Sequence, residues 1–422
     1  MVCYRARMMR GMKWWLVSLV LLVACGGGGG SSQQKNTLRI GGLLSLTGGW
    51  ASLGQTSQAA MELAADDVNT YLGQIGSDLR VEIEIADTKL DPDLAAAALQ
   101  DFAHDGVRVV VGPQSSAEVR AIKPIAEQRG VLSISQGSTA HSLAVPGDNI
   151  FRLCPDDEHE GPAIAALMLA DGKQAIVGIS RADDGNLGLQ TSTRASFTAQ
   201  GGTVLDGIVY PTDQTDFSGI AADLDARVSG AIADHGADAV GVYLTAFDEA
   251  AQLFAAAAVY PTLASVRWYG SDGVVASPAL LVPDSAPFAN AVGYPCPIFG
   301  LDPNAAPLRE PVAREVRDAT GLEPDAFGLS TYDAVWLITL AYLQAGGTKD
   351  LDQYKDAFTR TAETYFGVTG WTRLNAAGDR AEGAFDFNGI CPGGTTDYVW
   401  RHVGTFEPHG DGSSMITFTG CP

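Results

Sequence analysis

The sequence contains few charges, and positive charge is especially scarce. Charged residues make up 18% of the 422 residues, and 27 Lys and Arg stand against 49 Asp and Glu, for a formal net charge of -22. We find no extended cluster of lysines and arginines in the sequence. The net negative charge of the protein repels phosphate backbones, so we do not expect a nucleic-acid partner. Hydrophobic residues make up 46%, a composition typical of a folded chain.

Motifs for catalysis and for cofactors are also missing. The six histidines are scattered, with none at metal-ligand spacing, and no CxxC or Cys/His pattern suggests zinc. Gly178-Ile179-Ser180-Arg181-Ala182 lacks the second glycine of a nucleophile elbow, so an exported α/β hydrolase is disfavoured. No dinucleotide fingerprint follows the first expected strand. We therefore expect no enzyme, no cofactor and no metal site.

The N-terminal apolar run is too short to span a bilayer. Trp14 to Ala24 is eleven residues long and follows a positively charged start, a pattern typical of a secretory signal. The run ends in Leu22-Val23-Ala24-Cys25, which resembles the lipobox of bacterial lipoproteins; the resemblance implies cleavage before Cys25 and lipidation of that cysteine. The alternative is a chance cysteine near an ordinary cleavage site. We expect a signal peptide over 1–24 and a Gly/Ser tether over 25–36.

Export determines how the cysteines are interpreted. Cys3 leaves with the signal and Cys25 would carry lipid, which leaves four cysteines in an oxidising compartment: Cys154, Cys296, Cys391 and Cys421. Two disulfides are expected, and the residues alone leave all three pairings open.

From Thr37 onward, short β-branched runs alternate with helical stretches, the pattern of stacked βαβ units with parallel sheets. The length favours two lobes. Strands are expected over 38–44, 81–86, 107–111, 131–135, 175–180, 203–209, 239–244 and 266–269. Helices are expected over 54–72, 93–105, 117–129, 160–170, 187–200, 220–235, 249–260 and 330–344.

Ligands of open α/β sheets bind at the carboxyl ends of the strands, so the loops there are the candidate site. Ser115-Ser116-Ala117-Glu118 has the spacing of a capping box, where N–H groups and hydroxyls would attract a carboxylate, with Thr139 on the neighbouring loop. Asp272 lies in a glycine turn and offers a carboxylate of its own. The alternative is that these residues bind no ligand and only stabilise the backbone, as helix caps and turn residues.

Several motifs, in this order, carry a resemblance to a known family. They are Ser45-Leu46-Thr47-Gly48, Val110 to Ser116, Phe151 to Pro155 followed by Glu160-Gly161, Tyr269 to Gly273, Thr331 to Trp336, and Phe366 to Gly370 with Gly378-Asp379-Arg380. Over nearly all of 37–400 the chain resembles the type 1 periplasmic binding proteins that receive branched-chain amino acids.

This resemblance implies roles for individual residues. A ligand carboxylate would meet Ser116, Thr139 and the backbone of Gly137, and the ligand ammonium would meet Asp272. Aspartate is one methylene shorter than the glutamate of familiar leucine binders, so the ammonium must come closer or be reached through water.

The pocket walls depart from the family pattern. Where the family often places tyrosines, this chain has Leu53, Leu187, and Ala246 with Phe247, and the side walls are expected to be Trp50 and Phe247, with Gln114 also in the wall. Trp50 could equally be an exposed lip residue. These changes suggest a differently shaped apolar pocket.

The resemblance also implies two Rossmann-like lobes joined by three crossings. One lobe takes 36–153 plus 297–368, and the other takes 155–295 plus part of 369–422. Cys154 and Cys296 then fall at two crossings, which suggests a disulfide between them that braces the hinge, with Cys391 to Cys421 tying down the tail; the opposite pairing is the alternative.

The implied function is that of an exported, lipid-anchored receptor. It would capture an amino acid, branched-chain or related, between its lobes and deliver it to an ABC permease in the cytoplasmic membrane. Two alternatives stay open: a ligand sensor of the same fold, and a binder of a non-amino carboxylic acid.

Overall fold

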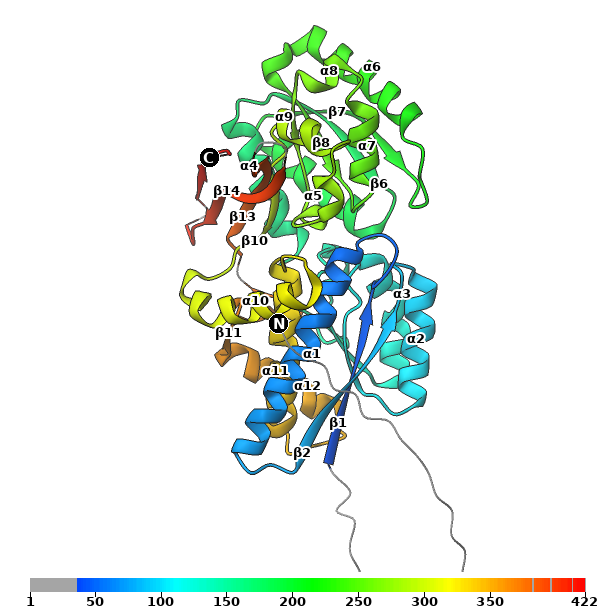
Figure 1. Cartoon of the computed structure of the whole chain (residues 1–422), viewed down its shortest axis with the longest axis vertical. Coiled ribbons are helices and arrows are strands. Elements are labelled where there is room, and N and C mark those ends of the chain that lie inside the picture. The colour runs from blue at the N-terminus through cyan, green and yellow to red at the C-terminus, as the bar shows by residue number, and fades with distance from the viewer. Residues whose placement is uncertain (1–35, 382, 395–396, 412, 422) are drawn as a thin grey trace, which may run out of the picture. The chain divides into compact units, whose positions relative to one another are not determined.

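The computed structural model describes residues 36–422 except 382, 395–396, 412 and 422. The predicted signal peptide, most of the tether and the lipidation residue Cys25 lie outside the described residues. Within 36–422, Figure 1 shows two groups of helices and strands, each built around its own sheet.

The first lobe contains a five-stranded parallel sheet in the order β2-β1-β3-β4-β5. Its strands are β1 (Asn36–Leu44), β2 (Leu79–Asp87), β3 (Val109–Val111), β4 (Leu132–Ser135) and β5 (Ile150–Arg152). Val109 and Val111 pack in one core with α1 and α11, while Val110 packs in another with α2 and α3. This alternation places helices on both faces of the sheet.

Helices from both the early and the later part of the chain complete this lobe (Figure 1). They are α1 (Ala51–Gln74), α2 (Pro92–His104), α3 (Ser116–Arg129), α10 (Ala306–Thr320), α11 (Ala326–Gln344) and α12 (Leu351–Thr364). By length and composition α11 could cross a membrane, but 78% of its apolar window is buried inside the protein, as in a core helix.

The second lobe contains a four-stranded parallel sheet in the order β7-β6-β8-β9. Its strands are β6 (Ala175–Arg181), β7 (Thr203–Tyr210), β8 (Val240–Thr245) and β9 (Arg267–Tyr269). Its helices are α4 (Asp157–Ala170), α5 (Asp184–Ala199), α6 (Ser218–His235), α7 (Ala250–Ala257), α8 (Pro261–Ala264) and α9 (Ala286–Ala291). The two predicted parallel sheets are thereby confirmed.

An antiparallel sheet, which the sequence pattern did not predict, is added by the tail. It has the order β10-β13-β14-β15, with β10 (Cys296–Phe299), β13 (Phe385–Pro392), β14 (Tyr398–Pro408) and β15 (Ser414–Phe418). Phe385, Phe387 and Ile390 belong to the core of the second lobe. A short ribbon of β11 (Phe366–Gly367) and β12 (Gly370–Trp371) lies between β10 and β13 in the chain.

The predicted disulfide between Cys154 and Cys296 is wrong, and the Cys391–Cys421 bond is present. The free, buried thiols face different partners: Cys154 donates to the Ser138 carbonyl at 3.4 Å, and Cys296 to the Tyr294 carbonyl at 3.8 Å. Proximity of both cysteines to the crossings did not ensure that their side chains point toward each other.

The chain passes between the lobes after β5, after β10 and before β13. At the first passage the Arg152 guanidinium donates from Nε and Nη2 to the two oxygens of Asp379, at 2.5 and 2.7 Å. Both side chains are buried. This ion pair joins the end of β5 to the segment that leads into β13.

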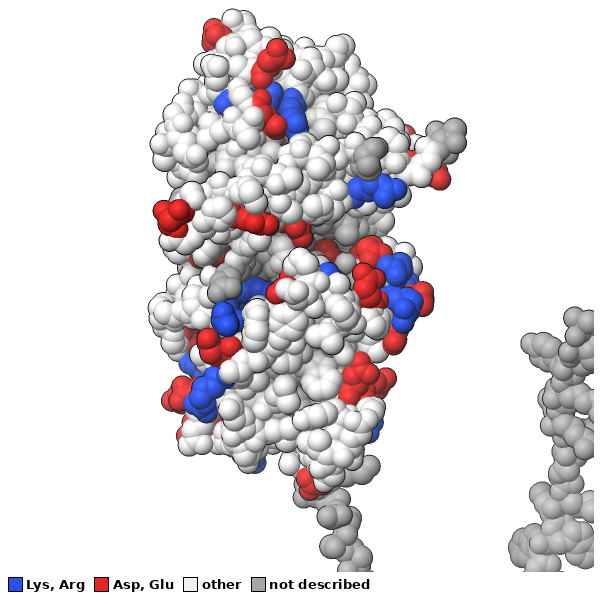
Figure 2. Space-filling model, turned by 90° about the vertical axis from the view of Figure 1, so that its left-hand side faces the viewer, with Lys and Arg blue, Asp and Glu red and all other residues white. Residues whose placement is uncertain are grey.

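The surface reflects the low content of charge. On the face drawn in Figure 2, basic and acidic groups lie beside one another and much of the area carries neither.

Replacing Asp379 should be strongly destabilising because it leaves the buried Arg152 charge unpaired. We expect Asp379→Ala to lower the free energy of unfolding by about 3–5 kcal/mol in urea denaturation. The control is Glu323→Gln, which breaks the exposed pair with Arg317 and should leave the midpoint unchanged. Equal effects of the two substitutions would contradict this account.

Thiol counting tests the cysteine assignment. The domain from residue 36, denatured without reductant, should yield two thiols per chain, those of Cys154 and Cys296, and neither should react while folded. A count of zero under denaturing conditions would show a second disulfide.

Candidate functional site

Residues from both lobes line one cavity of about 20 Å³. The first lobe contributes the residue before α1, the start of α3 and the loop after β4; the second contributes α5 and the loops after β8 and β9. The lining residues are Trp50, Ser115, Ser116, Gly137, Thr139, Gly185, Asn186, Leu189, Phe247 and Asp272.

The start of α3 forms one end of the cavity. Ser115 caps the helix, since its hydroxyl accepts from the Glu118 N–H while the Glu118 carboxyl accepts from the Ser115 N–H, the predicted capping box. Ser116 Oγ lies 3.0 Å from Ser138 Oγ and accepts from the Ala140 N–H at 3.2 Å. Hydroxyls and a helix N-terminus therefore meet here, a combination that suits an anion.

The backbone of Gly137, in the loop after β4, is packed tightly against Gln114 and Trp50, so a side chain there would require these neighbours to shift. A Cβ there would lie 3.0 Å from the Gln114 carbonyl oxygen and 3.2 Å from the Trp50 ring. Thr139, two residues on, is buried beside Ser116 in the cavity lining. Both residues lie in the same cavity as Asp272.

Asp272 forms the opposite end, in the short 3-10 turn Asp272–Val274 after β9. Its carboxylate accepts from the Gly273 N–H and is hydrogen-bonded to Glu160 on α4. Burial raises the pKa of Asp272 to about 6, against the lowering effect of these two hydrogen bonds.

A third acid, Asp157, is buried at the start of α4. Among the described residues, no donor reaches its carboxyl oxygens in good hydrogen-bond geometry, and the Thr139 hydroxyl is the polar neighbour that opposes the effect of burial on its pKa. Burial, reinforced by the charge of Asp272, raises the pKa of Asp157 to about 8, so this side chain is largely protonated at neutral pH.

Two aromatic rings from opposite lobes close the cavity. The Trp50 and Phe247 rings stack with centroids 4.5 Å apart, and Phe327 meets Trp50 edge-on at 6.0 Å. The Arg181 guanidinium lies 5.6 Å from the Phe247 centroid. The contact between these rings accounts for the small volume of the cavity.

The other predicted wall residues lie outside this lining. The Gln114 side chain donates to the Trp50 carbonyl at 3.0 Å and accepts from the Ser45 N–H, so it supports the loop that carries Trp50. Leu53 is buried behind Gly137, and Ala246 is buried next to Phe247. Leu187 is 38% exposed and lines a separate surface hollow, whereas Leu189, which the sequence interpretation missed, faces the cavity.

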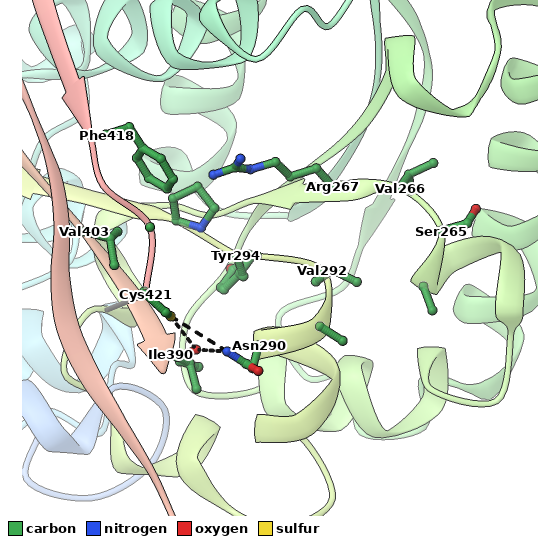
Figure 3. A pocket seen from close by; sticks show the side chains of 16 residues that line it. Ser265, Val266, Arg267, Asn290, Val292, Tyr294, Ile390, Val403, Phe418 and Cys421 are labelled. Atoms are coloured by element: carbon green, nitrogen blue, oxygen red, sulfur yellow. Dashed lines mark hydrogen bonds between the residues drawn. The ribbon is translucent and has the colours of Figure 1, made fainter. Parts of the chain in front are cut away.

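A larger hollow of about 430 Å³ lies elsewhere on the second lobe. Figure 3 shows it beside the C-terminal strand, where Asn290 donates to the Ile390 carbonyl and contacts Cys421. Its cation, Arg267, is 3.2 Å from Asp171 and lies over the Phe418 ring, so its charge is already engaged. None of the predicted ligand-binding residues lines it.

Residues 37–387 match the family described as periplasmic binding protein. The chain belongs to this family. An uncharacterized protein of Methanocaldococcus jannaschii is 27% identical over 88% of this chain and 90% of its own length. The Leu/Ile/Val-binding protein BraC3 of Rhizobium johnstonii is 26% identical over 79% of this chain and 88% of its own length.

Solved structures share the fold of this periplasmic binding protein. The leucine-binding protein LivK of Thermotoga maritima matches with a TM-score of 0.68 and 22% identity, over 91% of this chain and 99% of that one. Family and fold are those of solute-binding proteins rather than enzymes, and the family implies an extracytoplasmic location.

The raised pKa of Asp157 predicts that the folding stability of the binding protein depends on pH. Because its pKa is higher folded than unfolded, the folded state retains a proton that the unfolded state releases, and stability falls as pH rises from about 4 to about 8. Asp157→Asn should remove this fall and stabilise by a few kcal/mol at pH 8, with little change at pH 4. Urea denaturation across this range measures the effect.

Asp101→Asn, on the exposed face of α2, is the matched control and should leave the pH profile unchanged. The assignment fails if Asp157→Asn is destabilising at pH 8.

Proposed function

We propose that this protein captures an amino acid between its two lobes and delivers it to an ABC permease in the membrane. The observation that carries the proposal is that hydroxyls and a helix N-terminus from one lobe, and a carboxylate from the other, line the same cavity. A zwitterion removed from water needs a partner for each of its charges, and the two lobes supply one each.

The ligand carboxylate would bind at the first lobe. Ser116 and Thr139 would donate from their hydroxyls, and the backbone at Gly137 would lie against the ligand because no side chain keeps it away. The dipole of α3 adds stabilisation of about 0.3–1 kcal/mol.

The ligand ammonium would bind Asp272 on the second lobe. Among the residues that the structure describes, no lysine or arginine lines the cavity, so none of them competes there for Asp272. A non-amino carboxylic acid would supply this buried carboxylate with no positive charge, which favours a ligand with an amine.

The ligand side chain would contact Trp50, Leu189 and Phe247. Drug-sized ligands occupy pockets of about 300–1,000 Å³, so a cavity of about 20 Å³ admits an amino acid only if the stacked rings part. An aliphatic side chain, branched or related, would then bind between apolar surfaces.

Closure of the lobes would couple binding to delivery. The lobes already touch through the Trp50–Phe247 stack and through Asp248, whose carboxylate accepts from the N–H groups at the start of α1. Arg120 on α3 also pairs with Asp184 on α5 at 2.8 Å. A ligand that contacts both lobes would stabilise the closed form, which the permease would recognise. A lipid on Cys25 would hold the protein at the membrane.

A thermal-shift screen against the common amino acids and benzoate tests the ligand class. We expect an aliphatic amino acid to raise the melting temperature and benzoate to have no effect. In calorimetric titrations with that amino acid, Asp272→Asn should weaken binding about 10- to 100-fold, and Ser116→Ala about 2- to 10-fold.

The matched control is Asp206→Asn, an exposed change on the same lobe that should leave affinity unchanged. A response to benzoate alone would overturn the amino-acid proposal. Amino-acid binding that Asp272→Asn leaves intact would overturn the role of Asp272.

A further inference from the structure

Ser138 lies between the predicted ligand-binding residues Gly137 and Thr139 in the chain, but its side chain faces neither the cavity nor solvent. Its Oγ lies 3.0 Å from Oγ of Ser116, the first residue of α3 and a predicted donor to the ligand carboxylate. Within the described part of the chain, this is the hydrogen bond that the Ser138 hydroxyl makes. Ser138 therefore contacts the ligand site through Ser116.

The backbone of Ser138 is fixed by three neighbours. Its N–H donates to Ser135 Oγ at 3.1 Å, and the Ser135 hydroxyl donates in turn to the Pro113 carbonyl at 2.5 Å. The Ser138 carbonyl accepts from Arg152 Nη1 at 3.1 Å and from Cys154 Sγ at 3.4 Å. These bonds hold the Ser138 side chain where its hydroxyl meets that of Ser116.

The hydrogen between the two hydroxyls has two possible arrangements. If Ser116 donates to Ser138, the buried Ser138 proton has no acceptor among the described residues, which is unfavourable. If Ser138 donates, the Ser116 oxygen uses one lone pair for Ser138 and the other for the Ala140 N–H at 3.2 Å. The proton of Ser116 is then left for the cavity. A carboxylate bound there satisfies every donor in the second arrangement only.

We propose that Ser138 is a positioning residue: by donating to Ser116 it makes the Ser116 hydroxyl a donor toward the ligand and thereby selects a carboxylate over a carboxamide. The inference rests on the proposed function, from which it takes the carboxylate ligand. A carboxylate offers acceptors alone, whereas a carboxamide also has N–H groups that need an acceptor. With its lone pairs occupied by Ala140 and Ser138, Ser116 offers the carboxamide no acceptor.

Calorimetric titration with the amino acid found in the screen and with its amide tests this selection. Ser138→Ala leaves the Ser116 hydroxyl free to rotate and to accept, so it should weaken binding of the amino acid about 3- to 5-fold without weakening that of the amide. The ratio of the two dissociation constants should therefore fall about 3- to 5-fold. A merely structural role would weaken both ligands alike and leave this ratio unchanged.

Ser133→Ala is the matched control for the loss of a buried serine. The Ser133 hydroxyl lies on β4, is fully buried, and donates to the Gly112 carbonyl at 2.6 Å. This substitution removes a buried hydrogen bond at a neighbouring position, and it should leave the ratio of the amino acid and amide dissociation constants unchanged. Urea denaturation of both variants establishes that they are folded at the temperature of the titrations.

A double-mutant cycle tests whether Ser138 acts through Ser116. Once Ser116→Ala has removed the hydroxyl that Ser138 positions, adding Ser138→Ala should weaken amino-acid binding no further. Additive losses would overturn the proposal, as would an unchanged ratio in Ser138→Ala or an equal fall of the ratio in Ser133→Ala. If benzoate alone binds the wild type, the proposed amino-acid function fails, and the same comparison of benzoate with benzamide decides the role of Ser138.

Discussion

The buried guanidinium of Arg152 connects the hinge to the binding loop. It donates to both oxygens of Asp379 and, from Nη1, to the carbonyls of Ser138 and Ala140, which flank Thr139. One cation thus determines where the chain leaves the first sheet and where the loop that carries Gly137 and Thr139 lies. A buried charge is tolerated only when it is paired and its donors are satisfied, so this arrangement constrains all of the segments that supply its acceptors.

Three buried acids of the second lobe differ from this ion pair. Asp157, Glu160 and Asp272 lie close together without a dedicated cation, and burial raises the pKa of each. Arg152 is neutralised by its ion pair with Asp379, whereas Asp157 is neutralised at neutral pH largely by a proton. An acid that is left uncompensated in the folded protein can still gain a favourable partner from a ligand, and a binding site depends on such unpaired groups.

The sequence predicted which loop residues lie together more reliably than it predicted the residues around them. Because parallel strands end at one edge of a sheet, the loops that hold Ser116, Gly137, Thr139 and Asp272 could be predicted as neighbours, and all four line one cavity. Leu187 was predicted as a wall residue, but Leu189 lines the cavity instead. Residues two positions apart on a helix point about 200° away from each other, so Leu189 faces the cavity and Leu187 faces a separate surface hollow. Glu160 was noticed only as part of a motif, because nothing local indicates contact with Asp272.

The sequence by itself determined the alternation of strands and helices, the two parallel sheets and the turn residues at their carboxyl ends, because hydrophobic periodicity, capping boxes and glycine turns are local properties of the chain. Only the tertiary structure decided that the tail adds an antiparallel sheet to the second lobe, that Cys154 and Cys296 stay apart, and that Trp50 stacks on Phe247. These features depend on the direction of side chains brought together from distant segments, and no periodicity encodes that direction.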